Sequence, residues 1–274
     1  MTQKTLPLRG ALLGELLGTF LLVFFGVGSV HVAVLTGDLV GIGQVAAVWG
    51  LAVSLAIYAS ASMSGAHLNP AVTLAFASLR DFQMRRVVPY IVAQTTGAFV
   101  AAALLHVMFS GMIQAYHAEH AIDMQSAGGA ATAMLYGEYF PNPVGDPAWT
   151  ERWDELSTGG AFLAEMLGTA LLVGMIFTLT DPRNKMAPGP AGVPVAIALA
   201  LAAIICLIAP LTQAGLNPAR DFGPRVFAYF AGWGPTALPG PRGGFWIYLL
   251  APVVGGLLGG VLWDRVFRPA PVRE

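Results

Sequence analysis

The residue types that could do chemistry in this chain lie in short motifs, and one motif occurs twice. Asn-Pro-Ala stands in SGAHLNPAVT (64–73) and again in GLNPARDFGPR (215–225). Asparagine is a good helix N-cap and proline is favoured at the first helical position, so each copy predicts the start of a helix inside an apolar stretch. The side-chain amide also carries N–H groups that can donate hydrogen bonds to a small solute. The residues of the two copies are Asn69, Pro70, Ala71, Asn217, Pro218 and Ala219.

Two glutamates occupy matching positions ahead of these motifs. GELLGTFLLV (14–23) and AEMLGTALLV (164–173) share Glu-x-Leu-Gly-Thr-x-Leu-Leu-Val, which contains Glu15 in one copy and Glu165 in the other. An ionisable carboxyl group inside a membrane span costs about 2.5–3.5 kcal/mol on insertion scales, so it needs partners. We expect each glutamate to accept hydrogen bonds from the loop of its own half. The alternative is a proton-carrying carboxylate of an ion-coupled transporter.

The elements that must position these residues are long apolar helices. The chain has 274 residues, of which 56% are hydrophobic and 11% are charged, whereas soluble domains carry about 25% charged residues. Several stretches reach the ~20 apolar residues that cross a bilayer. The first is too long and too apolar for a cleaved signal peptide. The sequence therefore predicts a protein of the lipid bilayer, with spans near 9–34, 41–60, 87–109, 161–180, 192–212 and 245–267.

The distribution of lysine and arginine predicts the orientation of these spans. Six spans place both termini on one side, and the opposite loops hold only Arg152 and Arg242, plus Arg220 and Arg225 near the second Asn-Pro-Ala. The positive-inside rule then predicts cytoplasmic termini in the inner or plasma membrane of the cell. The basic residues expected on the cytoplasmic face are Lys4, Arg9, Arg80, Arg85, Arg86, Arg183, Lys185, Arg265, Arg268 and Arg273.

The long segment 110–159 is then external and acidic. We interpret it as a solvated loop rather than an ion-binding site. The net charge of −1 predicts no nucleic-acid partner, and the single cysteine, Cys206, is interpreted as a small buried apolar residue. The acidic residues of the segment are Glu119, Asp123, Glu138, Asp146, Glu151, Asp154 and Glu155.

The shared motifs indicate an internal duplication within one domain (1–274), with halves at about 8–109 and 160–268 joined by the external segment. Each half holds three predicted spans. Because three is an odd number, the second half enters the membrane from the opposite side, which is an inverted repeat with its site near the midplane.

The stretches that follow each Asn-Pro-Ala, 71–79 and 219–230, are too short to cross a bilayer and predict two half-helices. The loops before them, 62–67 and 211–216, are expected to be extended. Exposed backbone is not tolerated in hydrocarbon unless it is buried in protein or lines a water-filled cavity, so these loops predict a cavity. The residues expected to offer backbone carbonyls there are Ser64, Gly65, Ala66, His67, Gln213, Gly215 and Leu216.

From GELLGTFLLVFFGVG through SGAHLNPAVT to GLNPARDFGPR, the chain resembles the aquaporin and aquaglyceroporin (major intrinsic protein) family, and within it the bacterial glycerol facilitators. The resemblance implies an all-α integral membrane fold with six transmembrane helices and two re-entrant half-helices in a right-handed bundle. It implies a passive homotetrameric channel for glycerol and related small neutral polyols, which also conducts water and excludes protons and ions. We find no acid–base pair, activated nucleophile or phosphate loop, so the sequence predicts no enzyme, cofactor or metal.

The resemblance also assigns a selectivity filter of Trp49, Ile205, Ala214 and Arg220. Trp49 and Arg220 match the glycerol facilitators, which carry glycine and phenylalanine at the other two positions. Tryptophan, isoleucine, alanine and arginine together are closer to the filter of plant nodulin-type channels. A channel tuned to water, urea or metalloid acids such as arsenite or boric acid therefore stays open as an alternative.

Two further assignments come from the resemblance. Asp221 and Arg225 match the signature of glycerol channels, and physically they form an i,i+4 pair on the second half-helix. His67 is expected to anchor the first loop near the pore or, equally, to be a buried histidine with its hydrogen bonds satisfied. The same family pattern gives Glu15 and Glu165 the role of supporting the loops.

Overall fold

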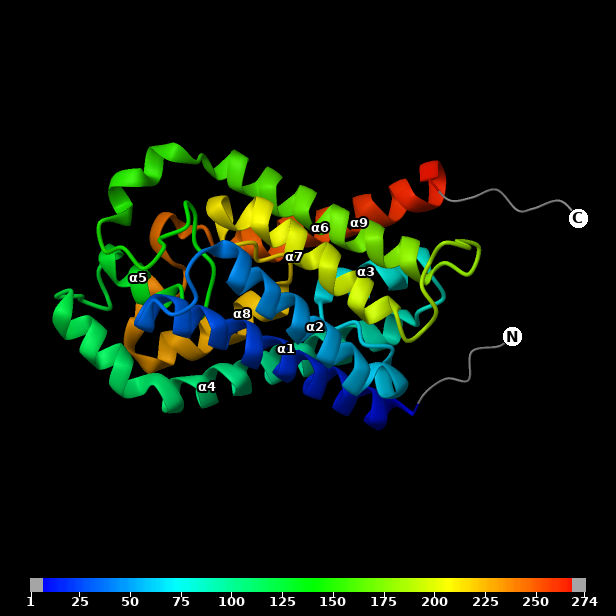
Figure 1. Ribbon diagram of the computed structural model, residues 1–274, viewed down its shortest axis with the longest axis horizontal. Coiled ribbons are helices and arrows are strands. Elements are labelled where there is room, and N and C mark those ends of the chain that lie inside the picture. The colour runs from blue at the N-terminus through cyan, green and yellow to red at the C-terminus, as the bar shows by residue number, and fades with distance from the viewer. Residues whose placement is uncertain (1–6, 268–274) are drawn as a thin grey trace, which may run out of the picture.

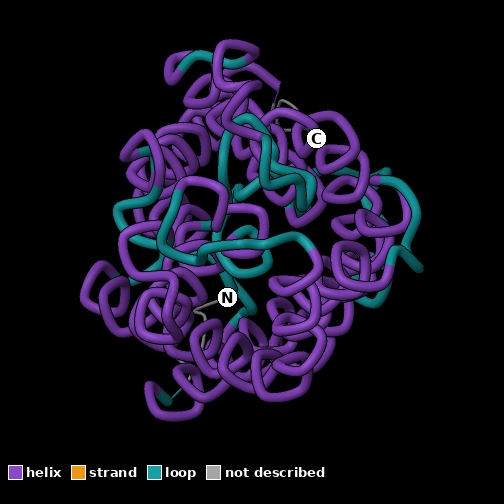
Figure 2. Tube along the Cα trace, turned by 90° about the vertical axis from the view of Figure 1, so that its left-hand side faces the viewer, coloured by secondary structure: helices purple, strands orange, loops and turns teal. Residues whose placement is uncertain are grey.

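The protein is a bundle of helices, described here from a computed structural model over residues 7–267. Within this range no residue belongs to a β-strand (Figure 2). Lys4, Arg268 and Arg273, which entered the predicted orientation, lie outside the described residues. The six long helices are α1 (Leu8–Thr36), α2 (Ile42–Ser64), α4 (Val87–Glu119), α6 (Thr158–Thr180), α7 (Val193–Thr212) and α9 (Phe245–Leu262), as Figure 1 shows.

All six helices are long and apolar enough to cross a membrane, α4 and α9 together with the short turns that adjoin them. Their outer faces carry large apolar side chains. Leu51, Val107 and Leu199, for example, are 63%, 72% and 69% exposed. Such surfaces are compatible with lipid rather than water. The chain is therefore a multi-pass membrane protein, and the predicted spans are confirmed.

Helix α4 extends beyond the predicted span, which was placed at 87–109, and ends at Glu119. The apolar run that defined the span stops earlier than the helix because packing stabilises the added turns. Ile113 is buried in a cluster with residues of segment 130–139, and His117 Nε2 lies 2.8 Å from Thr132 Oγ1. The end of this helix thus depends on contacts between residues far apart in the sequence.

Two half-helices complete the bundle, α3 (Pro70–Leu79) and α8 (Pro218–Ala228). Each starts as the cap chemistry predicts. Asn69 Oδ1 accepts a hydrogen bond from the N–H of Ala71 at 2.8 Å, and Asn217 Oδ1 accepts one from Ala219 at 3.0 Å. The adjacent proline occupies the first helical position, where a missing N–H carries no penalty. α8 runs on into a π-helical turn, Tyr229–Trp233.

Glycines allow the long helices to pack backbone to backbone in the same way in both halves. A Cβ atom at Gly97 of α4 would lie 2.3 Å from the carbonyl oxygen of Leu16 in α1. In the second half, a Cβ at Gly255 of α9 would lie 2.1 Å from the carbonyl oxygen of Met166 in α6. Small residues are the usual means of close helix approach in membranes. These contacts fix α1 against α4 and α6 against α9.

The segment between α4 and α6 does not form the predicted solvated loop. It contains η2 (Ala127–Gly129), α5 (Ala130–Ala133) and η3 (Trp149–Glu155). Residues 129–141 are buried, because aromatic side chains here pack with Trp233 after α8. Six of the seven acidic residues are nevertheless exposed, namely Glu119, Asp123, Asp146, Glu151, Asp154 and Glu155.

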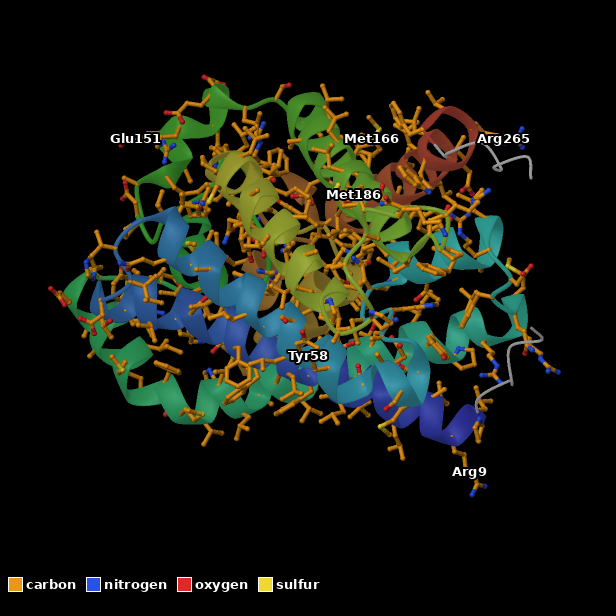
Figure 3. All side chains as sticks on the ribbon, turned by 45° about the vertical axis from the view of Figure 1, so that its right-hand side comes forward. Arg9, Tyr58, Glu151, Met166, Met186 and Arg265 are labelled. Carbon is orange, nitrogen blue, oxygen red and sulfur yellow. The ribbon has the colours of Figure 1, made fainter. Side chains whose placement is uncertain are left out.

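The two ends of the bundle differ in charge. The start of α1 and the last turn after α9 lie at the same end (Figure 1). Arg9 and Arg265 lie toward this end in Figure 3, whereas Glu151 lies at the other. The connections 80–86 and 181–192 share the end with Arg9 because successive long helices alternate in direction, and they hold Arg80, Arg85, Arg86, Arg183 and Lys185.

Candidate pore

A cavity of about 730 Å³ lies inside the bundle. Its wall is formed mainly by α2, α6 and α7, by the loops that precede α3 and α8, and by loop 181–192. Leu22 of α1 and Val72 and Phe76 of α3 also line it. Most of the side chains in this wall are aliphatic or aromatic. The polar part of the wall comes from the two loops, the asparagines of the two caps and Arg220, and, around loop 181–192, from residues such as Thr180, Asp181 and Asn184.

The loops before the half-helices have matching backbone conformations. In each loop, three residues at the same spacing have a positive φ, which costs a non-glycine residue about 1–2 kcal/mol. Strain of this kind is concentrated at functional sites. The φ values are 87°, 53° and 56° at Gly65, Ala66 and Leu68, and 63°, 60° and 54° at Gln213, Ala214 and Leu216.

Glu15 accepts hydrogen bonds from the first loop. The N–H groups of His67 and Leu68 donate to its two carboxylate oxygens at 2.9 and 2.7 Å, and Gln94 Nε2 donates at 2.7 Å. In a trans peptide the carbonyl points away from the N–H. The carbonyls of Ala66 and His67 therefore point away from Glu15, which is fully buried, and both residues line the cavity.

Glu165 makes the equivalent contacts in the second half. Its carboxylate accepts hydrogen bonds from the N–H groups of Gly215 and Leu216 at 2.9 and 2.7 Å and from the Thr212 hydroxyl at 2.6 Å. Like Glu15 it is fully buried, and it does not line the cavity. Each carboxylate is thus occupied by the loop of its own half, with no open path to the cavity.

The two half-helices meet at their N-terminal caps. Asn69 Nδ2 donates a hydrogen bond to the carbonyl of Leu216 at 2.9 Å, and Asn217 Nδ2 donates one to the carbonyl of Leu68 at 2.8 Å. Each amide has two N–H bonds, and this contact uses one of them. Both asparagines line the cavity. The caps of the two halves therefore interlock beside it.

All four predicted filter residues line the same cavity. Trp49 comes from α2, Ile205 from α7, Ala214 from the second loop and Arg220 from the first turn of α8. The Arg220 guanidinium carbon lies 4.5 Å from the centroid of the Trp49 ring, within range of a cation–π interaction. The arrangement combines an apolar wall with one cation.

Glu138 belongs to this site, although the sequence interpretation placed it in a solvated loop. It is 1% exposed and forms an ion pair with Arg220. Its Oε2 has no hydrogen-bond partner within residues 7–267. Burial outweighs the neighbouring arginines and raises the pKa of Glu138 to about 8. The sequence held one indication that Glu138 is buried, because it is the only acidic residue in the apolar and aromatic run LYGEYF (135–140).

Asp221 and Arg225 form more than a local helix pair. Both side chains are buried, and Arg225 Nε and Nη2 donate to the Asp221 carboxylate at 3.0 and 2.8 Å. Asp221 Oδ1 also accepts a hydrogen bond from the N–H of Glu138 at 2.7 Å, and Arg225 Nη1 donates to the carbonyl of Ala237 at 2.9 Å. The pair thereby fastens the segments around Glu138 and Ala237 to α8.

Two sequence expectations are wrong in this region. Ser64 does not line the cavity, because its carbonyl is taken by the Tyr90 hydroxyl at 2.9 Å and its own hydroxyl accepts from the N–H of Ala66. Cys206 is exposed rather than buried, since it follows Ile205 on α7 and neighbouring helix residues point about 100° apart. His67 is buried between the rings of Phe76 and Phe82 and lines the cavity.

Membrane-crossing helices around a cavity, with two half-helices meeting cap to cap at its wall, define a channel protein. A sequence model of the major intrinsic protein family matches residues 2–263, and the chain belongs to that family. It is accordingly a membrane channel and not an enzyme.

Several proteins are similar over almost their full length. The glycerol uptake facilitator protein of Haemophilus influenzae is 41% identical, covering 94% of each chain. That of Escherichia coli is 40% identical, covering 96% of this chain and 90% of its own. The propanediol uptake facilitator of Citrobacter freundii is 37% identical over 93% and 91%. Among solved structures, the aquaglyceroporin of Plasmodium falciparum matches with a TM-score of 0.82 at 27% identity, covering 96% of this chain and 98% of its own.

Proposed function

We propose that the protein is a passive channel for glycerol and related small neutral polyols, and that it also conducts water. The observation that carries the proposal is the pair of interlocked caps at the cavity wall. Each asparagine uses one amide N–H to bond the other half, and its second amide N–H can donate to a solute. The names of the relatives from Haemophilus influenzae and Escherichia coli support glycerol as the solute.

The wall chemistry suits a polyol because such a molecule has a carbon side and a hydroxyl side. Trp49 and Ile205 offer apolar surface to the carbon atoms, and Arg220 offers donors to the hydroxyl oxygens. The carbonyls of Ala66 and His67 supply acceptors for the hydroxyl protons. A solute can then lose its water shell without leaving its hydroxyl groups unpaired.

Exclusion of protons and cations follows from the half-helices. Each N-terminus carries about half a positive charge, and both N-termini lie at the same part of the cavity. A water molecule there must turn its oxygen toward Asn69 and Asn217, which interrupts the chain of donors that a proton needs. The same field repels cations.

Four buried charged residues support the pore without lining it. Glu15 and Glu165 hold the two loops so that their carbonyls face the cavity, and Asp221 with Arg225 holds the filter end together. An ion-coupled transporter would need a carboxylate that meets the solute path. Both glutamates instead accept hydrogen bonds from backbone N–H groups of the loops and lie away from the cavity.

The remaining proposals concern arrangement in the membrane. The halves are inverted repeats at about 8–109 and 160–268, and both termini lie in the cytoplasm because the basic residues gather at the end of the bundle where α1 starts. The protein lies in the inner or plasma membrane as a homotetramer with one pore per subunit. The last point follows from the family alone.

Stopped-flow light scattering on proteoliposomes tests the channel. We expect glycerol efflux well above that of empty vesicles, linear in the glycerol gradient and indifferent to a proton gradient. Glycerol flux equal to that of empty vesicles would refute the proposal. Saturable accumulation driven by a proton gradient would instead support a transporter.

A second candidate is a channel that prefers urea or metalloid acids such as arsenite or boric acid. Ala214 favours it, because a methyl group lines the cavity where the glycerol facilitators carry phenylalanine. The same vesicles distinguish the two candidates when the permeabilities of glycerol, urea and boric acid are compared, since each candidate predicts a different solute at the top of the ranking.

A further inference from the structure

Gly26 of α1 lies directly behind the ring of Trp49. We propose that Gly26 sets the width of the pore by leaving the space in which this ring rests against α1. It is a positioning residue, because it acts through Trp49 and does not itself line the cavity. The inference rests on the proposed function in one respect, namely that Trp49 forms the wall past which the solute moves.

The contact leaves no room for any side chain at position 26. A Cβ atom built there would lie 2.3, 2.4 and 2.5 Å from Cε3, Cζ3 and Cδ2 of the Trp49 ring. Carbon atoms in contact are normally about 3.5–4.0 Å apart. Even alanine therefore requires the ring or the helix to move by roughly an ångström, because protein interiors are close-packed.

The ring has space to move only toward the cavity. Trp49 is buried on the side of α1 and lines the cavity on the other. Movement of α1 away from the ring is opposed by α4, because a Cβ at Gly97 would lie 2.3 Å from the carbonyl oxygen of Leu16 and one at Gly28 would lie 3.3 Å from Cδ2 of Leu105. A displaced ring therefore approaches Arg220, whose guanidinium carbon is now 4.5 Å from the ring centroid.

The internal repeat shows that glycine is not demanded by the helix at this position. Aligning GELLGTFLLVFFG with AEMLGTALLVGMI places Gly26 opposite Ile176. Ile176 lines the cavity with its own side chain. At this position of the repeat, the first helix of the second half lines the cavity with Ile176, whereas in the first half Gly26 leaves space for the ring of Trp49, which lines the cavity from α2.

The test is the ratio of glycerol to water permeability in proteoliposomes, normalised to the amount of folded protein. We expect Gly26→Ala to lower glycerol permeability about tenfold and water permeability by much less, since one extra methyl group in a tight apolar site changes solute selection by a factor of this order. The matched control is Gly28→Ala on the same helix. A Cβ there meets only the flexible end of Leu105, at 3.3 Å, and the ratio should not change.

A double variant shows whether the effect passes through the ring. Phenylalanine at position 49 is smaller, so adding Gly26→Ala to Trp49→Phe should change the ratio by less than about twofold. If Gly26→Ala yields little folded protein, the double variant should recover it. An undiminished effect in the Trp49→Phe background, no recovery of folded protein, or an equal loss for glycerol and water would each overturn the inference.

The wild-type protein separates this inference from the proposed function. If wild-type vesicles release glycerol no faster than empty ones, the glycerol channel itself fails. If wild-type vesicles conduct glycerol and Gly26→Ala keeps the wild-type ratio, only the role of Gly26 fails.

Discussion

Arg220 is the cation of the cavity wall, and two side chains determine its surroundings. One neighbour is the ring of Trp49 and another is the carboxylate of Glu138. The field at this end of the cavity therefore differs between charged and protonated Glu138. A carboxylate that is buried beside an arginine is costly to charge and costly to leave unpaired, so its protonation is coupled to folding.

The raised pKa of Glu138 predicts a specific pH dependence of stability. Between its ordinary pKa near 4.5 and its folded pKa of about 8, the folded state holds a proton that the unfolded state releases. Stability from this group therefore falls as the pH rises through that window and is constant above it. We expect Glu138→Gln, which stays neutral, to lose less thermal stability between pH 5 and pH 9 than the wild type, as measured by unfolding in detergent.

Glu151→Gln is the matched control, because Glu151 is an exposed carboxylate of the same segment. Its stability profile should follow that of the wild type. An identical pH profile for Glu138→Gln and the wild type would contradict the pKa assignment.

Ala214 gives a second prediction at the level of a residue. Its methyl group lines the cavity, as Ile205 does, so Ala214→Phe adds a ring to the cavity wall. We expect the permeability of glycerol and larger polyols to fall by about tenfold or more, while water is affected least. Light scattering with a series of solutes of increasing size measures this, and an unchanged solute ranking would count against Ala214 as a filter residue.

At the scale of elements, the stability of the bundle depends on backbone contacts between helices. Met166 of α6 and Gly255 of α9 form one of these, and the corresponding contact in the first half joins Leu16 to Gly97. Because a carbonyl oxygen is rigidly held in a helix, it cannot yield as a side chain does. These two helix pairs, α1 with α4 and α6 with α9, therefore each have a point where only glycine fits.

Gly255→Ala should destabilise the protein by about 1–3 kcal/mol or more, because its Cβ would lie 2.1 Å from the Met166 carbonyl oxygen. Gly174→Ala is the control in the same helix pair. A Cβ at Gly174 meets the carbonyl of Gly259 at an ordinary 3.7 Å, and alanine is the better helix former. Equal unfolding temperatures for the two variants in detergent would show that this contact is not rigid.

The sequence predicted the elements whose causes are local. Cap chemistry located the starts of α3 and α8, and apolar length located the six spans. It could not predict that α4 continues to Glu119 or that the Ser64 carbonyl accepts a hydrogen bond from Tyr90, because each depends on a partner distant in the sequence. The ion pair of Glu138 with Arg220 is also of this kind, although the apolar run around Glu138 hinted at its burial. The prediction that Cys206 is buried was wrong for a different reason, because a helix in lipid also exposes apolar side chains on its outer face.

For the whole molecule, the halves are held together at the centre by reciprocal bonds. Asn69 needs the Leu216 carbonyl and Asn217 needs that of Leu68, so neither cap is complete within its own half. The external segment adds a second tie, because Glu138 contacts both Arg220 and Arg225 of α8. The candidate pore therefore forms only when both halves and the segment between them are present together.

The reciprocal cap bonds also bear on what a separate half could do. In a separate half, the asparagine amide could bond its carbonyl partner only in a second copy inserted in the opposite orientation. A chain that inserts in both orientations needs a similar number of lysine and arginine residues at its two ends. Covalent linkage removes that demand. The unequal charge of the two ends of this protein is thus compatible with two halves that are joined in one chain, and would not be compatible with a half that had to insert in both orientations.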